Sequence, residues 1–236
     1  MSDLADYAVI EVVLEHDHFA LYRARDAHNG EVLLKVTRDG ASHDQLSALS
    51  SDFLTARRCD VPAIPRPIRI DTMATGGTFQ VRRHVPGQPL SQWRDSRPVR
   101  PSQGESMQIV LLLLRALEPL HARGFVHCDI NPRTLLYDSD RRGIYFVDCA
   151  LTRGYGAVIQ RKAWQLTPYL APEQILDDAG KIDARADLYA VGVIGHELVT
   201  GELPSEEGLA PIVTASISGK FASVLAKLLN RDRERR

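Results

Sequence analysis

The stretch HCDINPRT, residues 127–134, lies between two kinds of predicted structure in this chain of 236 residues. Before it, Ser102 and Glu105 form a capping-box pair that predicts a helix to about residue 122, with a middle that is apolar on every side. After it, residues 134–137 and 144–147 form two apolar runs that predict short strands. We therefore expect a polar loop between a buried helix and a strand pair. Taken alone, an aspartate in such a loop usually caps a turn.

Four further motifs accompany this loop along the chain. Lys35 ends the apolar run VLLK and precedes Asp129 by 94 residues, and Asp148 opens the triplet DCA 19 residues after Asp129. The triplet APE follows at residues 171–173, and Asp187 begins a further apolar helical segment. Each motif is weak alone, but their order and spacing together form a strong signal.

In this order and spacing, the motifs resemble those of a eukaryotic-type protein kinase domain of the serine/threonine type, with some similarity to bacterial kinase-like domains. The loop matches the pattern H-R-D-L-x-x-x-N, Lys35 matches the end of V-A-I-K, and Asp148 matches the start of D-F-G. The resemblance covers nearly the whole chain. It implies an α+β fold with two lobes: a small antiparallel β lobe with one helix, then a larger, mainly α lobe that is shortened after the helix of Asp187.

The resemblance also implies a role for each matched residue. Lys35 would hold the ATP phosphates, Asp129 would accept the proton of a serine or threonine hydroxyl, and Asp148 would bind magnesium. Asn131 would be the third catalytic residue, and Thr134 would bind the cofactor and its metal together with Asp148. The implied cofactors are ATP and magnesium, and the implied partner is a protein substrate or binding protein.

Two other matched residues would be structural. Glu173 would pair with an arginine that follows the last helix, for which Arg236 is the candidate, and Asp187 would cap the catalytic loop from below.

The chain departs from the kinase pattern around the phosphates. The turn at residues 15–20 holds no glycine, and Glu15 and Asp17 add negative charge where a polyanion would bind. Thr134 replaces the asparagine that binds the second magnesium, and a hydroxyl is a poorer ligand for that cation. Asn131 replaces a lysine that stabilises the transferring phosphate. We therefore expect weak nucleotide and metal binding.

The helix acid that pairs with the strand lysine in this family has no direct match. The predicted helix at residues 41–58 holds no glutamate, and Asp52 is the nearest acid in register. Because aspartate is one methylene shorter, either the helix packs closer or Lys35 lacks an anchor. Cys128 replaces the arginine that receives a phosphorylated activation loop, so that mode of activation lacks its usual acceptor.

The first 85 residues predict a sheet interrupted by one helix. We expect a tight hairpin at Asn29-Gly30 and a hinge at the segment PGQP, residues 86–89, which should break any regular element. The predicted strands are at residues 7–14, 19–24, 31–37, near 68 and at 78–85, and the later helices are at about 187–200 and 221–230. This divides the chain into an N-lobe at 1–85, a linker at 86–91 and a C-lobe at 92–236.

Composition bears on partners and location. The net charge of −1 lacks the basic excess of a phosphate-backbone binder, so we expect no nucleic acid partner. The first residues carry acids where a signal peptide carries positive charge, and no apolar run could span a bilayer, so we expect no membrane contact. Three cysteines without metal-ligand spacing indicate reduced thiols and a cytoplasmic location. His16-Asp17-His18 lacks a third ligand and is interpreted as a solvated turn.

Two functions stay open on the sequence. The first is a protein serine/threonine kinase of low turnover, in which Asp129, Lys35 and Asp148 carry out phosphoryl transfer. The second is a catalytically inactive pseudokinase that acts as a binding or regulatory scaffold. The three intact charged residues favour the first slightly, and nothing positive supports a third reading, phosphoryl transfer to a small molecule.

Overall fold

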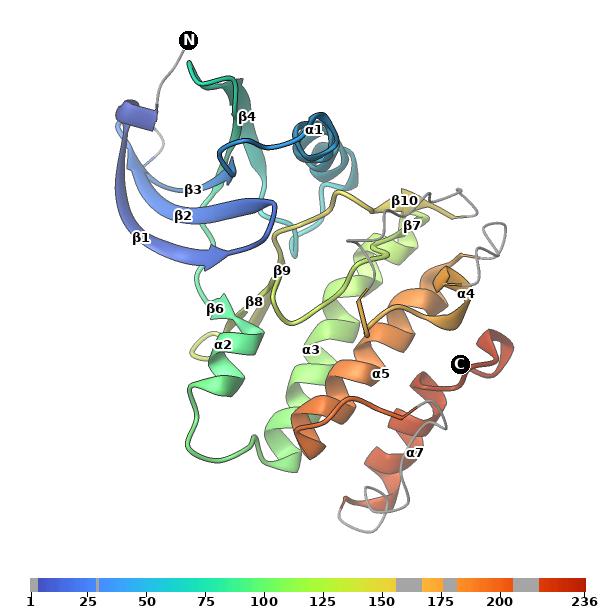
Figure 1. The fold of residues 1–236 in the computed structure, drawn as a ribbon. Helices are drawn as coiled ribbons and strands as arrows, with labels where there is room; N and C mark the ends of the chain where they lie inside the picture. The colour runs from blue at the N-terminus through green and yellow to red at the C-terminus, as the bar shows by residue number, and fades with distance from the viewer. Residues whose placement is uncertain (1–3, 29, 156–166, 176–181, 206–216) are drawn as a thin grey trace. The chain divides into compact units, whose positions relative to one another are not determined.

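The computed structural model describes residues 4–28, 30–155, 167–175, 182–205 and 217–236 (Figure 1). The chain forms two compact units, of which the first contains Met1–Gln92 and Arg133–Ala150 and the second contains Trp93–Pro132 and Leu151–Arg236. An antiparallel sheet with one helix in the first unit and a mainly helical second unit confirm the α+β, kinase-like fold expected from the sequence.

The first unit is built on a five-stranded antiparallel sheet with the order β1-β2-β3-β5-β4. A short 3-10 helix, η1 (Leu4–Asp6), precedes the strands β1 (Tyr7–Glu15), β2 (Phe19–Asp26), β3 (Gly30–Thr37), β4 (Pro67–Thr72) and β5 (Thr78–Arg83). Gly30 has a φ of 72°, as a tight hairpin requires, while Asn29 lies outside the described residues. Buried side chains of one sheet face form its core: Tyr7, Ala24, Val32, Leu34, Val36, Phe79 and Val81.

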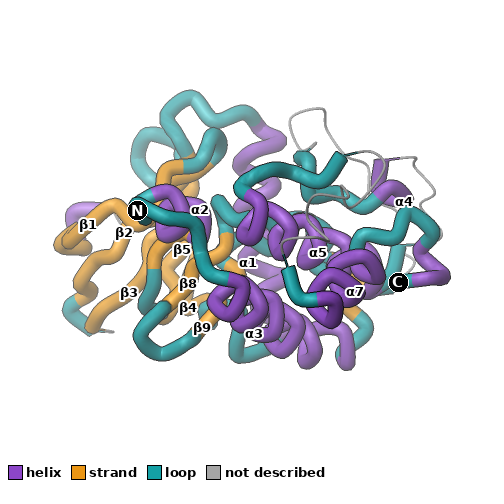
Figure 2. Tube along the Cα trace, turned by 90° about the horizontal axis from the view of Figure 1, so that it is seen from below, coloured by secondary structure: helices purple, strands orange, loops and turns teal. Residues whose placement is uncertain are grey.

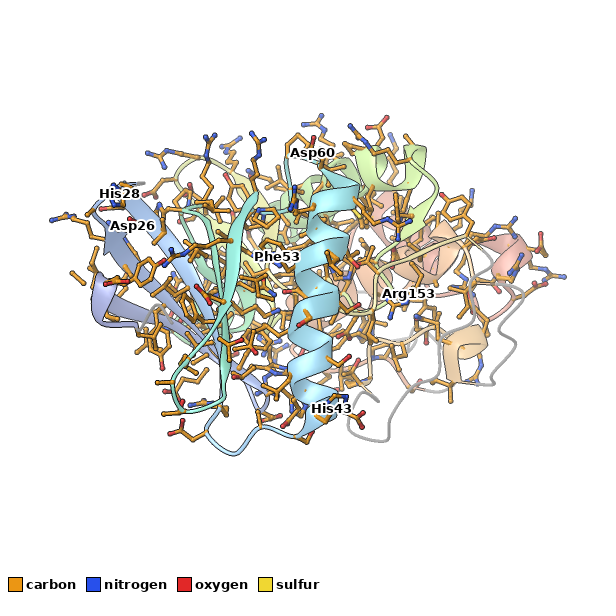
Figure 3. The ribbon with its side chains drawn as sticks, turned by 90° about the horizontal axis from the view of Figure 1, so that it is seen from above. Asp26, His28, His43, Phe53, Asp60 and Arg153 are labelled. Carbon is orange, nitrogen blue, oxygen red and sulfur yellow. The ribbon has the colours of Figure 1, made fainter. Side chains whose placement is uncertain are left out.

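The helix of the first unit, α1 (His43–Cys59), begins and ends at clear signals. Ser42 and Gln45 form a capping box at its start, and Asp60 adopts a left-handed conformation at its end. Figure 3 shows His43 and Asp60 at opposite ends of α1, with Phe53 between them. The buried face of α1 carries one acid, Asp52, among apolar side chains.

A second, three-stranded sheet of the first unit contains β6 (Gln88–Pro89), β8 (Leu135–Asp138) and β9 (Gly143–Phe146), in the order β6-β8-β9. Leu136 and Val147 join a buried cluster with residues of β2 and β3, and the N–H of Phe146 donates to the carbonyl of Ala63 at 2.8 Å. Residues 133–150 therefore pack with the N-terminal strands, whereas the sequence-based division placed them in the C-lobe.

The expectation that residues 86–89 break any regular element is wrong, because Gln88 and Pro89 form β6 and pair with Tyr137 and Leu136. Gly87 makes this pairing feasible. Its φ is 114°, and a Cβ at this position would lie 2.8 Å from the backbone of Tyr137. Only glycine combines that backbone conformation with such a close approach.

The second unit consists mainly of α3 (Gln103–Ala122), α5 (Ala184–Thr200) and α7 (Gly219–Leu228), with α5 packed against both α3 and α7 (Figure 2). The capping box of Ser102 and Glu105 is confirmed. Gly195 lets α5 approach its neighbours, since a Cβ there would lie 2.8 Å from Val110 of α3 and 2.7 Å from Leu225 of α7. The shorter elements are β7 (Phe125–Val126), β10 (Arg153–Gly154), α4 (Pro172–Ile175) and η4 (Arg233–Arg235), and α2 (Leu90–Asp95) continues from one unit into the next.

Helix α5 begins three residues earlier than expected, because the side chain of Asp183 accepts a hydrogen bond from the N–H of Arg185 and caps it. The predicted shortening after α5 falls largely on residues 206–216, which lie outside the described residues. Within the described ranges, every helix is too short or too polar to cross a bilayer.

Candidate active site

Lys35 is a buried cation of the first unit with three hydrogen-bond partners. It lies on the central strand β3 with 1% of its surface exposed. Its Nζ donates to Asp52 Oδ2 at 2.9 Å, to Asp148 Oδ1 at 2.9 Å and to the carbonyl of Val147 at 3.2 Å. Since an ammonium group has three N–H donors, these bonds use all of them. Of the two alternatives left open by the sequence, the structure shows the anchored lysine.

Asp52 is the anchor, and it serves more than Lys35. Its Oδ2 also accepts from Arg82 Nη2 at 2.7 Å and from Gln80 Nε2 at 3.1 Å, and its Oδ1 accepts from the N–H of Cys149 at 2.7 Å. Both Asp52 and Arg82 have side chains that are fully buried. One carboxylate of α1 therefore connects β3, β5 and the segment that follows β9. Because a buried charge is costly without partners, the four donors explain why an acid is tolerated here.

Asp148 is held in its charged form. Burial raises its pKa, but the charge and hydrogen bond of Lys35 outweigh burial and bring the pKa to about 2. Within the described residues, both hydrogen bonds to its side chain reach Oδ1, from Lys35 and from the N–H of Ala150, so Oδ2 remains for a cation. A charged carboxylate oxygen is the ligand that magnesium prefers, so this residue fits the metal implied by the resemblance.

An aromatic ring at the start of β2, and no glycine, lies next to Lys35, and the turn between β1 and β2 adds a second ring behind it. The Phe19 ring centroid lies 4.0 Å from Lys35 Nζ, and the His16 ring stacks on Phe19 with 4.9 Å between centroids. Burial lowers the pKa of His16 to about 4, against the opposing charge of Asp148, so the imidazole is neutral at neutral pH. His16 is thus half-buried against Phe19, which differs from the solvated turn expected from the sequence.

The catalytic-loop residues belong to the second unit, where Asp187 of α5 organises them. Its carboxylate accepts from the N–H groups of His127 and Cys128, both at 2.8 Å, and lies 2.8 Å from Nε2 of His121. Cys128 has a φ of 70°, a left-handed backbone conformation that is uncommon for residues other than glycine. The hydrogen bond from its N–H to the Asp187 carboxylate stabilises this conformation. This confirms the prediction that Asp187 caps the loop. Asp129 follows directly, half-buried, with its N–H donating to His127 Nδ1 at 3.3 Å.

Two further residues of the second unit, Arg236 and Gln174, make hydrogen bonds that hold the APE segment at residues 171–173. Arg236 Nη2 donates to Glu173, and both side chains are buried, which confirms the predicted pair. Gln174 donates from Nε2 to the carbonyl of Cys128 at 3.0 Å and accepts from the N–H of Ala171. Gln174 therefore links the APE segment directly to the catalytic loop.

The predicted site residues fall into two groups. Lys35, Asp148 and Thr134 lie in the first unit, where Thr134 is buried and its carbonyl accepts from the N–H of Val147 at 3.3 Å. Asp129 and Asn131 lie in the second unit, and Asn131 is buried. The structure brings Lys35 and Asp148 into direct contact, and their catalytic roles stay predictions.

Sequence reasoning missed Gln80, Arg82 and Gln174. The first two leave a partial signal: they alternate with the apolar Phe79 and Val81 of β5, so their side chains share one face of this interior strand. Gln174 leaves no such signal, because a glutamine after APE is indistinguishable from a solvated helix residue.

Comparison with known proteins agrees with this geometry. The family pattern described as the protein kinase domain matches residues 81–236. This chain belongs to the protein kinase family. It is 30% identical to the serine/threonine-protein kinase pkn3 of Myxococcus xanthus over 217 residues, which covers 86% of this chain and 39% of that protein.

Two other relatives show the same relation. The serine/threonine-protein kinase Pkn1 of Myxococcus xanthus is 33% identical over 150 residues, covering 58% of this chain and 20% of its own length. The DNA damage-responsive serine/threonine-protein kinase RqkA of Deinococcus radiodurans is 27% identical over 203 residues, covering 84% and 30%. The chain thus spans about two fifths or less of the length of these kinases.

Proposed function

We propose that this chain is a protein serine/threonine kinase domain that transfers the γ-phosphoryl group of ATP to protein hydroxyls. The observation that carries the proposal is Lys35 Nζ at 2.9 Å from the carboxylates of both Asp52 and Asp148. A kinase needs a lysine anchored by a helix acid and a carboxylate that is charged and able to bind metal. The same contacts meet both needs.

In this proposal each residue has one task. Asp129 accepts the proton of the substrate hydroxyl, Lys35 holds the phosphates, and Asp148 binds magnesium through Oδ2. Asn131 and Thr134 complete the positions around the transferring phosphate, with a hydroxyl in place of an amide at Thr134. Magnesium, when bound, neutralises charge on the phosphates. Because all three N–H donors of Lys35 are occupied, phosphate can bind this residue only after one of its present bonds opens.

The direct test is transfer of labelled phosphate from ATP to a generic protein substrate such as casein, with magnesium present. Loss of a general base typically costs about a hundredfold to ten thousandfold in rate, so Asp129→Asn should reduce transfer by at least that lower factor. Exposed Asp39 offers a matched control, since Asp39→Asn makes the same chemical change away from the site. Transfer that is unchanged in Asp129→Asn would refute the assignment.

A second candidate, a pseudokinase scaffold, is favoured by the surroundings of Lys35. The ammonium group is enclosed by Asp52, Asp148 and the Phe19 ring, and the turn above it holds no glycine. This alternative predicts background transfer and no rise in melting temperature with ATP, with or without magnesium. A rise of several degrees that requires magnesium and is lost in Asp148→Asn would favour the kinase instead.

A further inference from the structure

The first unit contains a hollow of about 550 Å³ that the kinase chemistry does not use. It lies where the end of α1 meets the start of β3, the start of β4 and the end of β5. Its lining residues are Glu31, Arg57, Asp60, Arg66, Pro67, Ile68 and Arg83. Asp60, at the end of α1, marks its position in Figure 3. A volume of this size is within the range of sites that bind small molecules or peptide side chains.

Three arginines give the hollow its chemical character. Arg57 belongs to the last turn of α1, and the N–H of Arg83 donates to the carbonyl of Arg66 at 2.9 Å, which places those two residues side by side. All three are exposed. Within the described residues, none of their guanidinium groups has a carboxylate within 4 Å, and Arg57 has only the Phe53 ring, 6.0 Å away.

The two acids of the lining offset this charge only in part. The negative charge of Glu31 is already compensated by Arg23, because both carboxylate oxygens lie 2.9 Å from Arg23 Nη2. This hydrogen bond also lowers the pKa of Glu31. Asp60 is the other acid, and it is exposed. The hollow therefore carries an excess of positive charge. Its guanidinium groups can donate two parallel hydrogen bonds each to a phosphate.

An apolar hollow adjoins the basic one. It has a volume of about 300 Å³ and shares Asp60, Arg66 and Arg83 with its neighbour. Its other lining residues are all apolar: Val61, Pro62, Ile64, Pro65 and Val85. A ligand that fills both hollows needs an anionic group and an apolar group a short distance apart.

We propose that these two hollows form a docking site for a peptide segment that carries a phosphoserine or phosphothreonine beside an apolar residue. The phosphate would bind among Arg57, Arg66 and Arg83, and the apolar side chain would bind against Ile64 and its neighbours. A free phosphate ion would use the basic hollow alone, so the apolar neighbour favours a peptide. The site does not depend on phosphoryl transfer by this chain.

The test uses two fluorescein-labelled octapeptide pools, one with a fixed phosphoserine-leucine pair and the other with serine-leucine. Fluorescence anisotropy with the whole chain should show the phosphorylated pool binding at least about tenfold tighter, since hydrogen bonds to charged groups are among the strong ones. The Arg66→Ala/Arg83→Ala double variant should lose at least about tenfold in affinity. Asp60→Asn, which keeps a residue suited to the left-handed conformation, should bind about twofold tighter or more, because it removes a repelling charge.

Two controls separate this site from other effects. Arg115→Ala removes an exposed arginine of α3 and should leave binding unchanged. Asp129→Asn should also leave it unchanged, so that failure of the proposed kinase activity and failure of the docking site are distinguishable. Equal affinity for the two pools, or undiminished binding by a folded Arg66→Ala/Arg83→Ala variant, would overturn the proposal. Displacement of the peptide by an equal concentration of inorganic phosphate would also overturn it, in favour of a free-anion site.

Discussion

Replacing Asp52 by asparagine tests whether one buried carboxylate holds the first unit together. The substitution preserves the size of the side chain but removes its charge. Lys35 then keeps its ion pair with Asp148, whereas Arg82 loses the one carboxylate that lies within 4 Å of it among the described residues. Removing one partner of a buried ion pair typically costs about 3–5 kcal/mol, because the remaining charge is buried without compensation. Since a domain is stable by only about 5–15 kcal/mol, we expect a large loss in the free energy of unfolding.

The assay is urea unfolding followed by far-UV circular dichroism. Asp39→Asn makes the same chemical change at an exposed position and should change the free energy of unfolding by no more than about 0.5 kcal/mol. In the Asp52→Asn background, adding Arg82→Met should recover part of the stability, because it removes the cation that has lost its carboxylate partner. A loss below about 1 kcal/mol in Asp52→Asn, within the range of a single neutral hydrogen bond, would refute the reasoning.

Three further predictions concern acid stability, thiol reactivity and backbone packing. Because the pKa of Asp148 is lowered to about 2, its charged form stabilises the fold above about pH 4, and this contribution is lost as pH falls towards 2. In Lys35→Met the burial that raises this pKa acts without the ammonium, so thermal melting should show a smaller loss of stability between pH 4 and pH 2 than in the wild type. All three cysteines are buried and burial raises the pKa of Cys149, so Ellman's reagent at pH 8 should find no rapidly reacting thiol in the folded chain and three in urea. A Cβ added at Gly192 would lie 2.8 Å from Leu228, so Gly192→Ala should lose about 1–3 kcal/mol in urea unfolding, whereas Gly219→Ala has open space and should be neutral or slightly stabilising.

Each of these predictions has an outcome that contradicts it. Identical acid profiles for the wild type and Lys35→Met would mean that the ion pair does not control Asp148. One thiol that reacts within seconds in the folded chain would contradict the burial of the cysteines. Equal effects of alanine at Gly192 and Gly219 would contradict the close approach of α5 and α7.

Much of the fold follows from local sequence signals. The capping box at Ser102 and the apolar runs of β1, β2 and β3 predict those elements to within a few residues, because these signals act between near neighbours in the chain. The pairing of β6 with β8 was missed. It depends on Gly87 approaching Tyr137, 50 residues away in sequence, and a strand of two residues has no periodicity to detect.

The candidate site was predictable where a motif fixes both residue and position. The family pattern identifies Lys35, Asp129, Asp148 and Asp187 because phosphoryl transfer and its supporting loop need those residue types in that order. Arg82 is different, since its partner Asp52 lies 30 residues away and on another element. Only the folded chain shows that a buried arginine and a buried lysine share one acid.

The full coordination of Lys35 has a consequence for kinetics. If nucleotide binding must wait for one of the three bonds of the ammonium group to open, the observed association rate will level off at high ATP concentration instead of rising in proportion to it. The plateau would then equal the opening rate of the lysine. A ligand that enters freely would show no plateau, so stopped-flow mixing with a fluorescent ATP analogue would reveal how firmly the resting state is closed.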